Sequence, residues 1–130
     1  MAKTVFFVDD DEDDRFLFRQ AISIVNKELN VFEMIDGQHL MEAIEDFSAN
    51  QIDLVLLDLN MPRMNGLETV KAIRAKFPIN PIPTVIISTA SHPLYIEQAY
   101  ACGATDFITK PNSFEGIIEL ARQLTYRFLM

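Results

Sequence analysis

The stretch IDLVLLD at residues 52–58 decides the fold class, because an almost unbroken apolar run ends abruptly in an acidic residue. A run of this length and composition predicts a strand that is covered on both faces, as in a parallel sheet. Short apolar runs recur along the 130 residues, and each is followed by a longer amphipathic stretch. The predicted strands are therefore 4–8, 31–35, 52–57, 84–88 and 105–109.

The stretches between these runs have the residue spacing of amphipathic helices. In the first stretch one helix face is apolar, made of Leu17, Ala21, Ile24, Val25 and Leu29. A second helix is predicted over about 38–48. A third is predicted to begin near Gly66 and to end before Pro78, since proline disfavours the helical conformation in the residue before it.

Capping residues position the last two helices. Ser91 is predicted to cap the fourth helix, and Pro93 is tolerated in its first turn. This helix should end ahead of Gly103, a residue suited to the position after a helix. The fifth helix is predicted to open at Asn112 or Ser113 and to run to the C-terminus.

The order of elements is thus (βα)5, which predicts an α/β fold. Alternating strands and helices imply a doubly wound, five-stranded parallel sheet with helices on both faces. In the flavodoxin-like strand order 2-1-3-4-5, the first and third strands are neighbours. Binding sites in such sheets lie beyond the carboxyl ends of the strands. The length suits a single domain over 1–130, without an output domain.

Composition excludes several classes of protein. The 19 acidic and 11 basic residues give a net charge of -8, which argues against direct binding of nucleic acid and favours cationic partners or a metal site. Cys102 is the only cysteine, so no internal disulfide can form and a reducing cytoplasm is expected. No stretch has the length of a membrane span or the pattern of a signal peptide.

Acidic residues end two of the predicted neighbouring strands. Asp9 and Asp10 follow the first strand and Asp58 follows the third, so their carboxylates should converge at one edge of the sheet. Close carboxylates repel one another unless a cation compensates, and oxygen ligands of this kind suit Mg2+. Asp13 and Asp14, by contrast, are predicted to be solvated charges in the first turn of a helix.

Polar side chains also follow the last two strands. Ser88 and Thr89 come at the end of the fourth strand and offer hydroxyl groups. Lys110 leaves the fifth strand and needs an anionic partner if it is buried. The bond to Pro111 can be cis at a sharp turn, which would aim the lysine back over the sheet. A carboxylate nucleophile, a metal, a hydroxyl and an ammonium together predict phosphoryl transfer.

These residues resemble the receiver domain of two-component response regulators, especially the single-domain chemotaxis type. The matching segments are VDDD at 8–11, LLDLNMPRMNG at 56–66, IISTA at 86–90 and FITKP at 107–111. Together they extend over essentially the whole chain. Serine stands at 88, where threonine is commoner in the family, and phenylalanine stands at 107, where the chemotaxis type has tyrosine.

The resemblance implies a role for each matched residue. Asp58 would accept a phosphoryl group, and Mg2+, with Mn2+ as a substitute, would be held by Asp9, Asp10, Asp58 and the carbonyl of Asn60. Ser88, Thr89 and Lys110 would bind the phosphoryl oxygens, and Phe107 would turn inward as a switch. Asn60 and Ala90 would flank the path of the attacking water, and because Ala90 cannot orient water, slow loss of the phosphoryl group is expected.

The resemblance also implies partners and a signalling role rather than an enzymatic one. The phosphoryl donor would be a histidine kinase or histidine phosphotransfer protein, docking near Phe16 or Phe18, one of which should be partly exposed. Output would pass through the surface of the fourth helix, fifth strand and fifth helix to an unknown protein target or a second copy of the chain.

Three alternatives remain. An aspartyl-phosphate phosphohydrolase of the haloacid dehalogenase type usually has a second aspartate where this chain has Asn60, which cannot act as an acid or base. A flavin-binding domain of this fold would avoid the acidic run at 9–14, which repels phosphate. A dimerisation module that is never phosphorylated would not need the residues that the chemistry requires.

Overall fold

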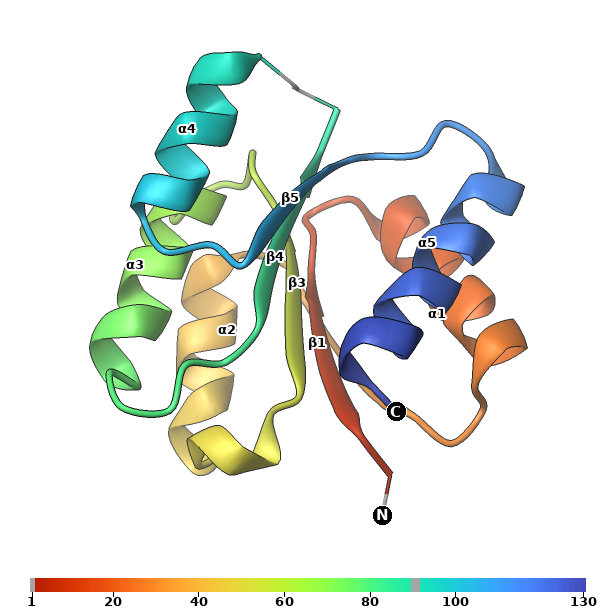
Figure 1. The fold of residues 1–130 in the computed structure, drawn as a ribbon, viewed down its shortest axis with the longest axis horizontal. Helices are drawn as coiled ribbons and strands as arrows, with labels where there is room; N and C mark the ends of the chain where they lie inside the picture. The colour runs from red at the N-terminus through yellow and green to blue at the C-terminus, as the bar shows by residue number, and fades with distance from the viewer. Residues whose placement is uncertain (1, 90–91) are drawn as a thin grey trace.

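Five parallel strands form the centre of the protein, seen in a computed structural model that describes residues 2–89 and 92–130 (Figure 1). The strands are β1 (Thr4–Val8), β2 (Asn30–Met34), β3 (Leu54–Asp58), β4 (Thr84–Ser88) and β5 (Asp106–Thr109). They lie in the order β2-β1-β3-β4-β5, and each neighbouring pair is parallel. The predicted flavodoxin-like order is therefore confirmed, and β1 does lie beside β3.

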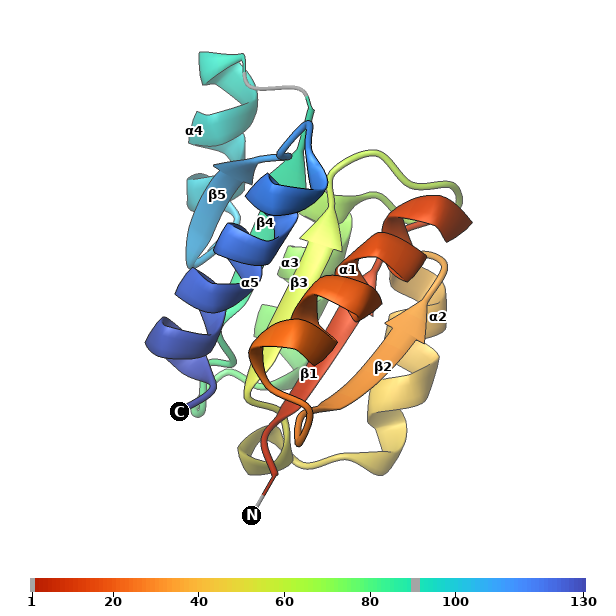
Figure 2. The ribbon, with the colours of Figure 1, turned by 90° about the vertical axis from the view of Figure 1, so that its right-hand side faces the viewer.

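Helices cover both faces of the sheet (Figures 1 and 2). One face carries α1 (Glu12–Val25) and α5 (Phe114–Phe128). The other carries α2 (Gly37–Ala43), α3 (Gly66–Lys76) and α4 (Pro93–Ala101). Within the described ranges, no helix is both long and apolar enough to cross a lipid bilayer.

Alternation along the strands divides the core into two layers. Val5 and Phe7 of β1, with Leu54 and Leu56 of β3, belong to the layer beneath α1 and α5. The residues between them, such as Phe6 and Val8, belong to the layer beneath α2, α3 and α4. Successive side chains of a strand point to opposite faces. The same parity assigns Asp9 and Asp58 to the side of α1 and α5.

The predicted apolar face of α1 was partly wrong. Ile24 is 59% exposed, whereas Phe18 and Ile22 are buried beside Ala21. The set Phe18, Ala21, Ile22 and Val25 also has the spacing of one helix face, and packing of α1 on the sheet beside α5 selects it. Phe16 is 49% exposed, which confirms that one of the two phenylalanines faces solvent.

Several element boundaries differ from the prediction by a few residues. The α-helical part of α2 ends at Ala43, and the 3-10 turns Ile44–Asp46 and Ala49–Gln51 replace its predicted end. These turns place Phe47 in edge contact with Phe6, at 5.1 Å between ring centroids. His92 caps α4 by accepting from the amide of Leu94, and the predicted cap Ser91 lies outside the described residues. Ser113 caps α5 as predicted.

Candidate functional site

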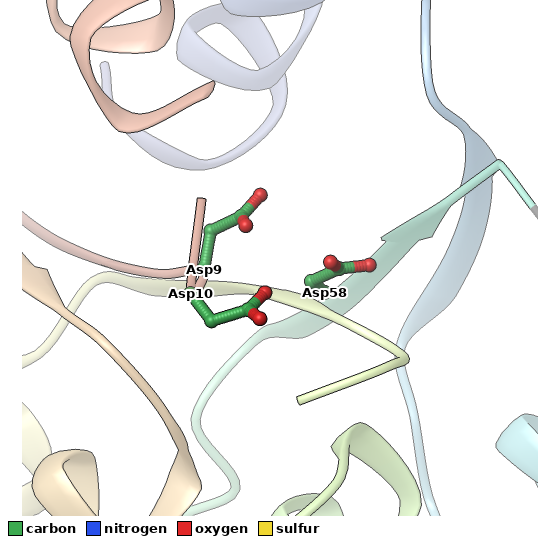
Figure 3. A group of neighbouring side chains, drawn as sticks. All are labelled: Asp9, Asp10 and Asp58. Carbon is green, nitrogen blue, oxygen red and sulfur yellow. The ribbon is translucent and has the colours of Figure 1, made fainter. Parts of the chain in front are cut away.

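The carboxyl ends of β1 and β3 bring three aspartates together (Figure 3). Val8 pairs with Leu57 in the sheet, so the next residues along the two strands, Asp9 and Asp58, end side by side. One carboxylate oxygen from each of Asp9, Asp10 and Asp58 lies within 4.8 Å of the other two. Three hard oxygen ligands at this spacing fit a divalent cation such as Mg2+, which keeps several waters in its remaining positions.

Burial of these carboxylates favours a cation nearby. Asp9 is fully buried and Asp58 is 9% exposed, whereas Asp10 is open to solvent. Burial raises the pKa of Asp9 to about 6, against the hydrogen bond from the Asp11 amide and the charge of Lys110. Burial also raises the pKa of Asp58, opposed by Lys110 and by the amides of Leu59 and Asn60. A bound cation would favour the ionised form of both groups.

Lys110 supplies a positive charge within the same cluster. Its Nζ lies 2.9 Å from Asp9 Oδ2, 2.7 Å from Asp14 Oδ2 and 3.5 Å from Asp58 Oδ2. Burial by itself would lower the pKa of Lys110, but the hydrogen bonds to Asp14 and Asp9 outweigh it and raise the pKa above its usual value. The ammonium therefore stays charged, and the prediction that Asp14 is merely a solvated helix charge was wrong.

The direction of Lys110 follows from strand alternation. Ile108 of β5 packs into the layer beneath α1 and α5, and Lys110, two residues later, points to the same side. The Lys110 amide donates to the Ser88 carbonyl at 2.8 Å, so it extends the β4–β5 ladder. Among the described residues no peptide bond is cis, so the prediction of a cis bond to Pro111 was wrong.

The hydroxyl residues and the predicted switch residue lie along β4 and β5. Ser88 is buried, one position beyond the pairing of Ile87 with Asp58, and Thr89 is exposed. Phe107 is half-buried against the layer beneath α2, α3 and α4. Its amide donates to Asp106 Oδ1 at 2.8 Å. Ala90 lies outside the described residues.

A tight loop joins β3 to α3 and wraps around the Asp58 carboxylate. The amides of Leu59 and Asn60 donate to that carboxylate, and the Gly66 amide donates to the Leu59 carbonyl at 2.8 Å. A Cβ atom on Gly66 would lie 2.7 Å from the Asp58 carbonyl oxygen, so the loop can close only over glycine. Asn65 then caps α3.

Sequence reasoning missed two residues beside this loop. Asp36, at the start of α2, is 1% exposed, and Arg63 of the loop donates to both of its carboxylate oxygens. An aspartate followed by Gly37 and a helical stretch is a local signal for a cap, which could have identified Asp36. Arg63 has no such local signal, since its partner lies 27 residues away.

Both the sequence and the fold are similar to those of known proteins. The response regulator receiver domain family matches residues 5–122. The chain is 35% identical over 112 residues to the two-component response regulator ORR1 of Oryza sativa subsp. japonica, covering 82% of this chain and 48% of that protein. It is 34% identical over 100 residues to the chemotaxis protein CheY1 of Helicobacter pylori strain J99, covering 76% of this chain and 81% of that protein.

The fold has similar solved structures as well. The phosphorylated cyanobacterial phytochrome response regulator RcpA matches with a TM-score of 0.85 and 26% identity, over 96% of this chain and 92% of that chain. The chain spans less than half the length of ORR1, so similarity to that protein concerns only the part that is shared.

Proposed function

Because the chain belongs to the response regulator receiver family, we propose that Asp58 accepts a phosphoryl group from a phosphohistidine. The donor would be a histidine kinase or a histidine phosphotransfer protein. The observation that carries the proposal is the position of Asp58, which lies beside two further aspartates and 3.5 Å from the Lys110 ammonium. Receiver domains are signalling domains, and this cluster contains the parts that phosphoryl transfer requires.

In the proposed step, a carboxylate oxygen of Asp58 attacks the phosphorus atom of the phosphohistidine. The bond between phosphorus and the imidazole nitrogen breaks, and the nitrogen keeps the electron pair. The released imidazole of the donor is neutral because one of its two nitrogens carries a proton. An acyl phosphate remains on Asp58. The amides of Leu59 and Asn60, which donate to the Asp58 carboxylate, hold it in place for attack.

The residues around Asp58 fit a magnesium ion. Asp9, Asp10, Asp58 and the carbonyl of Asn60 would hold it, and Mn2+ would serve as a substitute because it prefers similar oxygen ligands. The ion would neutralise charge on the phosphoryl oxygens during transfer. The Asp9 carboxylate would bind the ion from a fully buried position, so its orientation is set by its place at the end of β1.

In this proposal the phosphoryl oxygens are bound by Lys110, Ser88 and Thr89. Lys110 stays protonated, and a shift of its ammonium toward the acyl phosphate would relax its contacts with Asp9 and Asp14. Ser88 and Thr89 come from the neighbouring strand β4 and would add hydroxyl donors. Such a rearrangement at the ends of β4 and β5 would turn Phe107 inward. Because burial of its ring leaves no polar group unpaired, the inward position would also be populated without the phosphoryl group.

We infer that output passes through the surface of α4, β5 and α5 to a protein target or to a second copy of the chain. The alternative is a phosphorelay intermediate, which transfers the phosphoryl group to another protein. The residue two positions after Ser88 is Ala90, and alanine has no side-chain group that could orient a water molecule. The phosphorylated form should therefore last far longer than seconds, and decay within seconds would contradict this part of the proposal.

Titration with beryllium fluoride, a mimic of the phosphoryl group, tests the proposed site in solution. With Mg2+ present, amide resonances of Thr89, Phe107 and Lys110 should shift in the wild type. They should not shift without Mg2+ or in Asp58→Asn. Equal shifts in Asp58→Asn would mean that another residue binds the mimic.

A further inference from the structure

An ion pair between the exposed side chain of Arg63 and the buried carboxylate of Asp36 links the loop after β3 to the start of α2. Arg63 Nε donates to Asp36 Oδ2 at 2.7 Å and Arg63 Nη2 donates to Asp36 Oδ1 at 3.0 Å, so the guanidinium binds the carboxylate with two parallel hydrogen bonds. Asp36 is 1% exposed and also accepts from the His39 amide at 2.9 Å, which caps α2. A two-pronged contact of this kind fixes direction as well as distance.

The Asp36 end of this pair lies where α2 and α3 are closely packed. A Cβ atom on Gly37, the next residue, would lie 1.9 Å from Thr69 Oγ1 of α3, so α2 and α3 approach each other here too closely for any side chain. Thr69 is itself buried and donates to the Asn65 carbonyl at 2.7 Å. Asp36 is therefore an anchor set by the packing of two helices.

The Arg63 end carries an unfavourable backbone conformation. Its φ is +62°, in the left-handed region that non-glycine residues rarely adopt. The neighbouring amide of Met64 donates to the Pro62 carbonyl at 2.6 Å, which marks a sharp turn at this point. The loop therefore has its one left-handed non-glycine residue at the position where the guanidinium reaches a buried carboxylate.

This loop also contains the residue whose carbonyl is proposed to bind the metal. Asn60 lies two residues after Asp58, and its amide donates to the Asp58 carboxylate. At its far end, the Gly66 amide holds the Leu59 carbonyl at 2.8 Å. Arg63 lies in the stretch between Asn60 and Gly66. Its bond to Asp36 therefore restrains the middle of this stretch, away from the backbone contacts at its two ends.

We propose that Arg63 is a positioning residue for the metal site: through Asp36 it holds the Asn60 carbonyl in place and thereby sets the affinity for Mg2+. The inference rests on the proposed function, because it assumes that Asn60 and the aspartates bind Mg2+. Magnesium requires near-ideal octahedral geometry, so a loop that samples several positions binds it more weakly than a loop that is held.

Calorimetric titration of the full chain with MgCl2 tests this, comparing the wild type with Arg63→Gln, Arg63→Lys and Arg122→Gln. Arg122 lies on the exposed surface of α5 and pairs with Glu119, so its replacement removes the same charge without touching the loop. Arg63→Gln should bind Mg2+ about 10-fold more weakly than Arg122→Gln, as expected for loss of a supporting contact. Arg63→Lys keeps the charge but not the two-pronged bond and should show a smaller loss.

Each outcome has a distinct meaning. If the wild type binds Mg2+ and Arg63→Gln binds as tightly as Arg122→Gln, the pair only stabilises the fold and the inference is wrong. If the wild type itself does not bind Mg2+, the proposed function fails and this inference fails with it. If Arg63→Gln does not fold well enough to titrate, Arg63→Lys decides, and an affinity equal to the wild type would overturn the inference.

Discussion

Lys110 Nζ lies closer to Asp14 Oδ2, at 2.7 Å, than to the candidate acceptor Asp58, at 3.5 Å. The lysine that leaves β5 is thus held by the first turn of α1, and its contact with Asp58 is the longest of its three. Asp14 lies outside the group of three carboxylates that can share a cation. Asp14 can therefore keep its contact with Lys110 whether or not Asp9 and Asp58 bind a metal ion.

Replacing Asp14 should weaken the fold modestly. We expect Asp14→Asn to lose about 1 kcal/mol of unfolding free energy, because one charge-assisted hydrogen bond is lost at a partly exposed site. Urea unfolding at pH 7 measures this. Asp13→Asn is the matched control, since Asp13 is an exposed neighbour in the same turn and should change stability by less than about 0.5 kcal/mol. Equal effects of the two variants would contradict the role given to Asp14.

Removing the lysine should make the protein depend more on magnesium. In Lys110→Ala the buried Asp9 and Asp58 lose the cation that compensates them, so Mg2+ should raise the melting temperature more than it does in the wild type. Thermal unfolding with and without MgCl2 measures both shifts. The same Mg2+-dependent shift in both proteins would show that Lys110 and the metal do not neutralise the same carboxylates.

Acid unfolding should reveal the pair of Asp36 and Arg63. The hydrogen bonds from Arg63, opposed by burial, lower the pKa of Asp36 below its usual value of 3.8. A lowered folded-state pKa gives stability that is present above the unfolded-state pKa and is lost as the pH falls through the folded-state pKa. The difference in unfolding free energy between wild type and Arg63→Gln should be constant from pH 7 to about 5 and shrink below about pH 4. A difference unchanged at pH 3 would contradict this.

The buried face of α1 can be tested with two isoleucines that lie two residues apart. Ile22 is 2% exposed and Ile24 is 59% exposed. Ile22→Ala should cost about 2–4 kcal/mol of unfolding free energy, whereas Ile24→Ala should stay within about 0.5 kcal/mol. Chemical denaturation of both variants measures the contrast, which would be reversed if the face inferred from sequence alone were the buried one.

The positions of the strands could be predicted from local apolar runs. The proximity of the acidic residues could be predicted because neighbouring parallel strands end at one edge of the sheet. Unbroken apolar runs fix the buried strands, and the strand order then brings Asp9 beside Asp58. The face of α1 could not be chosen this way. Phe18 and Ile22 fit the helical period as well as Leu17 and Ile24 do, and only the packing of α1 against α5 distinguishes the two sets.

Contacts between distant residues were the other part that sequence reasoning missed. Asp14 and Lys110 are 96 positions apart, and Asp36 and Arg63 are 27 positions apart. Acidic residues near a helix start are favoured by the helix dipole alone, so nothing local separates Asp14 from Asp13. Their different surroundings arise only when β5 brings Lys110 beside the first turn of α1.

Phosphorylation of Asp58 can be measured by intact-mass spectrometry after incubation with MgCl2 and acetyl phosphate. The wild type and the control Asp46→Asn, an exposed aspartate of the turn after α2, should each gain the mass of one phosphoryl group, and this gain should be lost in acid. Asp58→Asn should gain none. No gain on the wild type, or an equal gain on Asp58→Asn, would contradict the account.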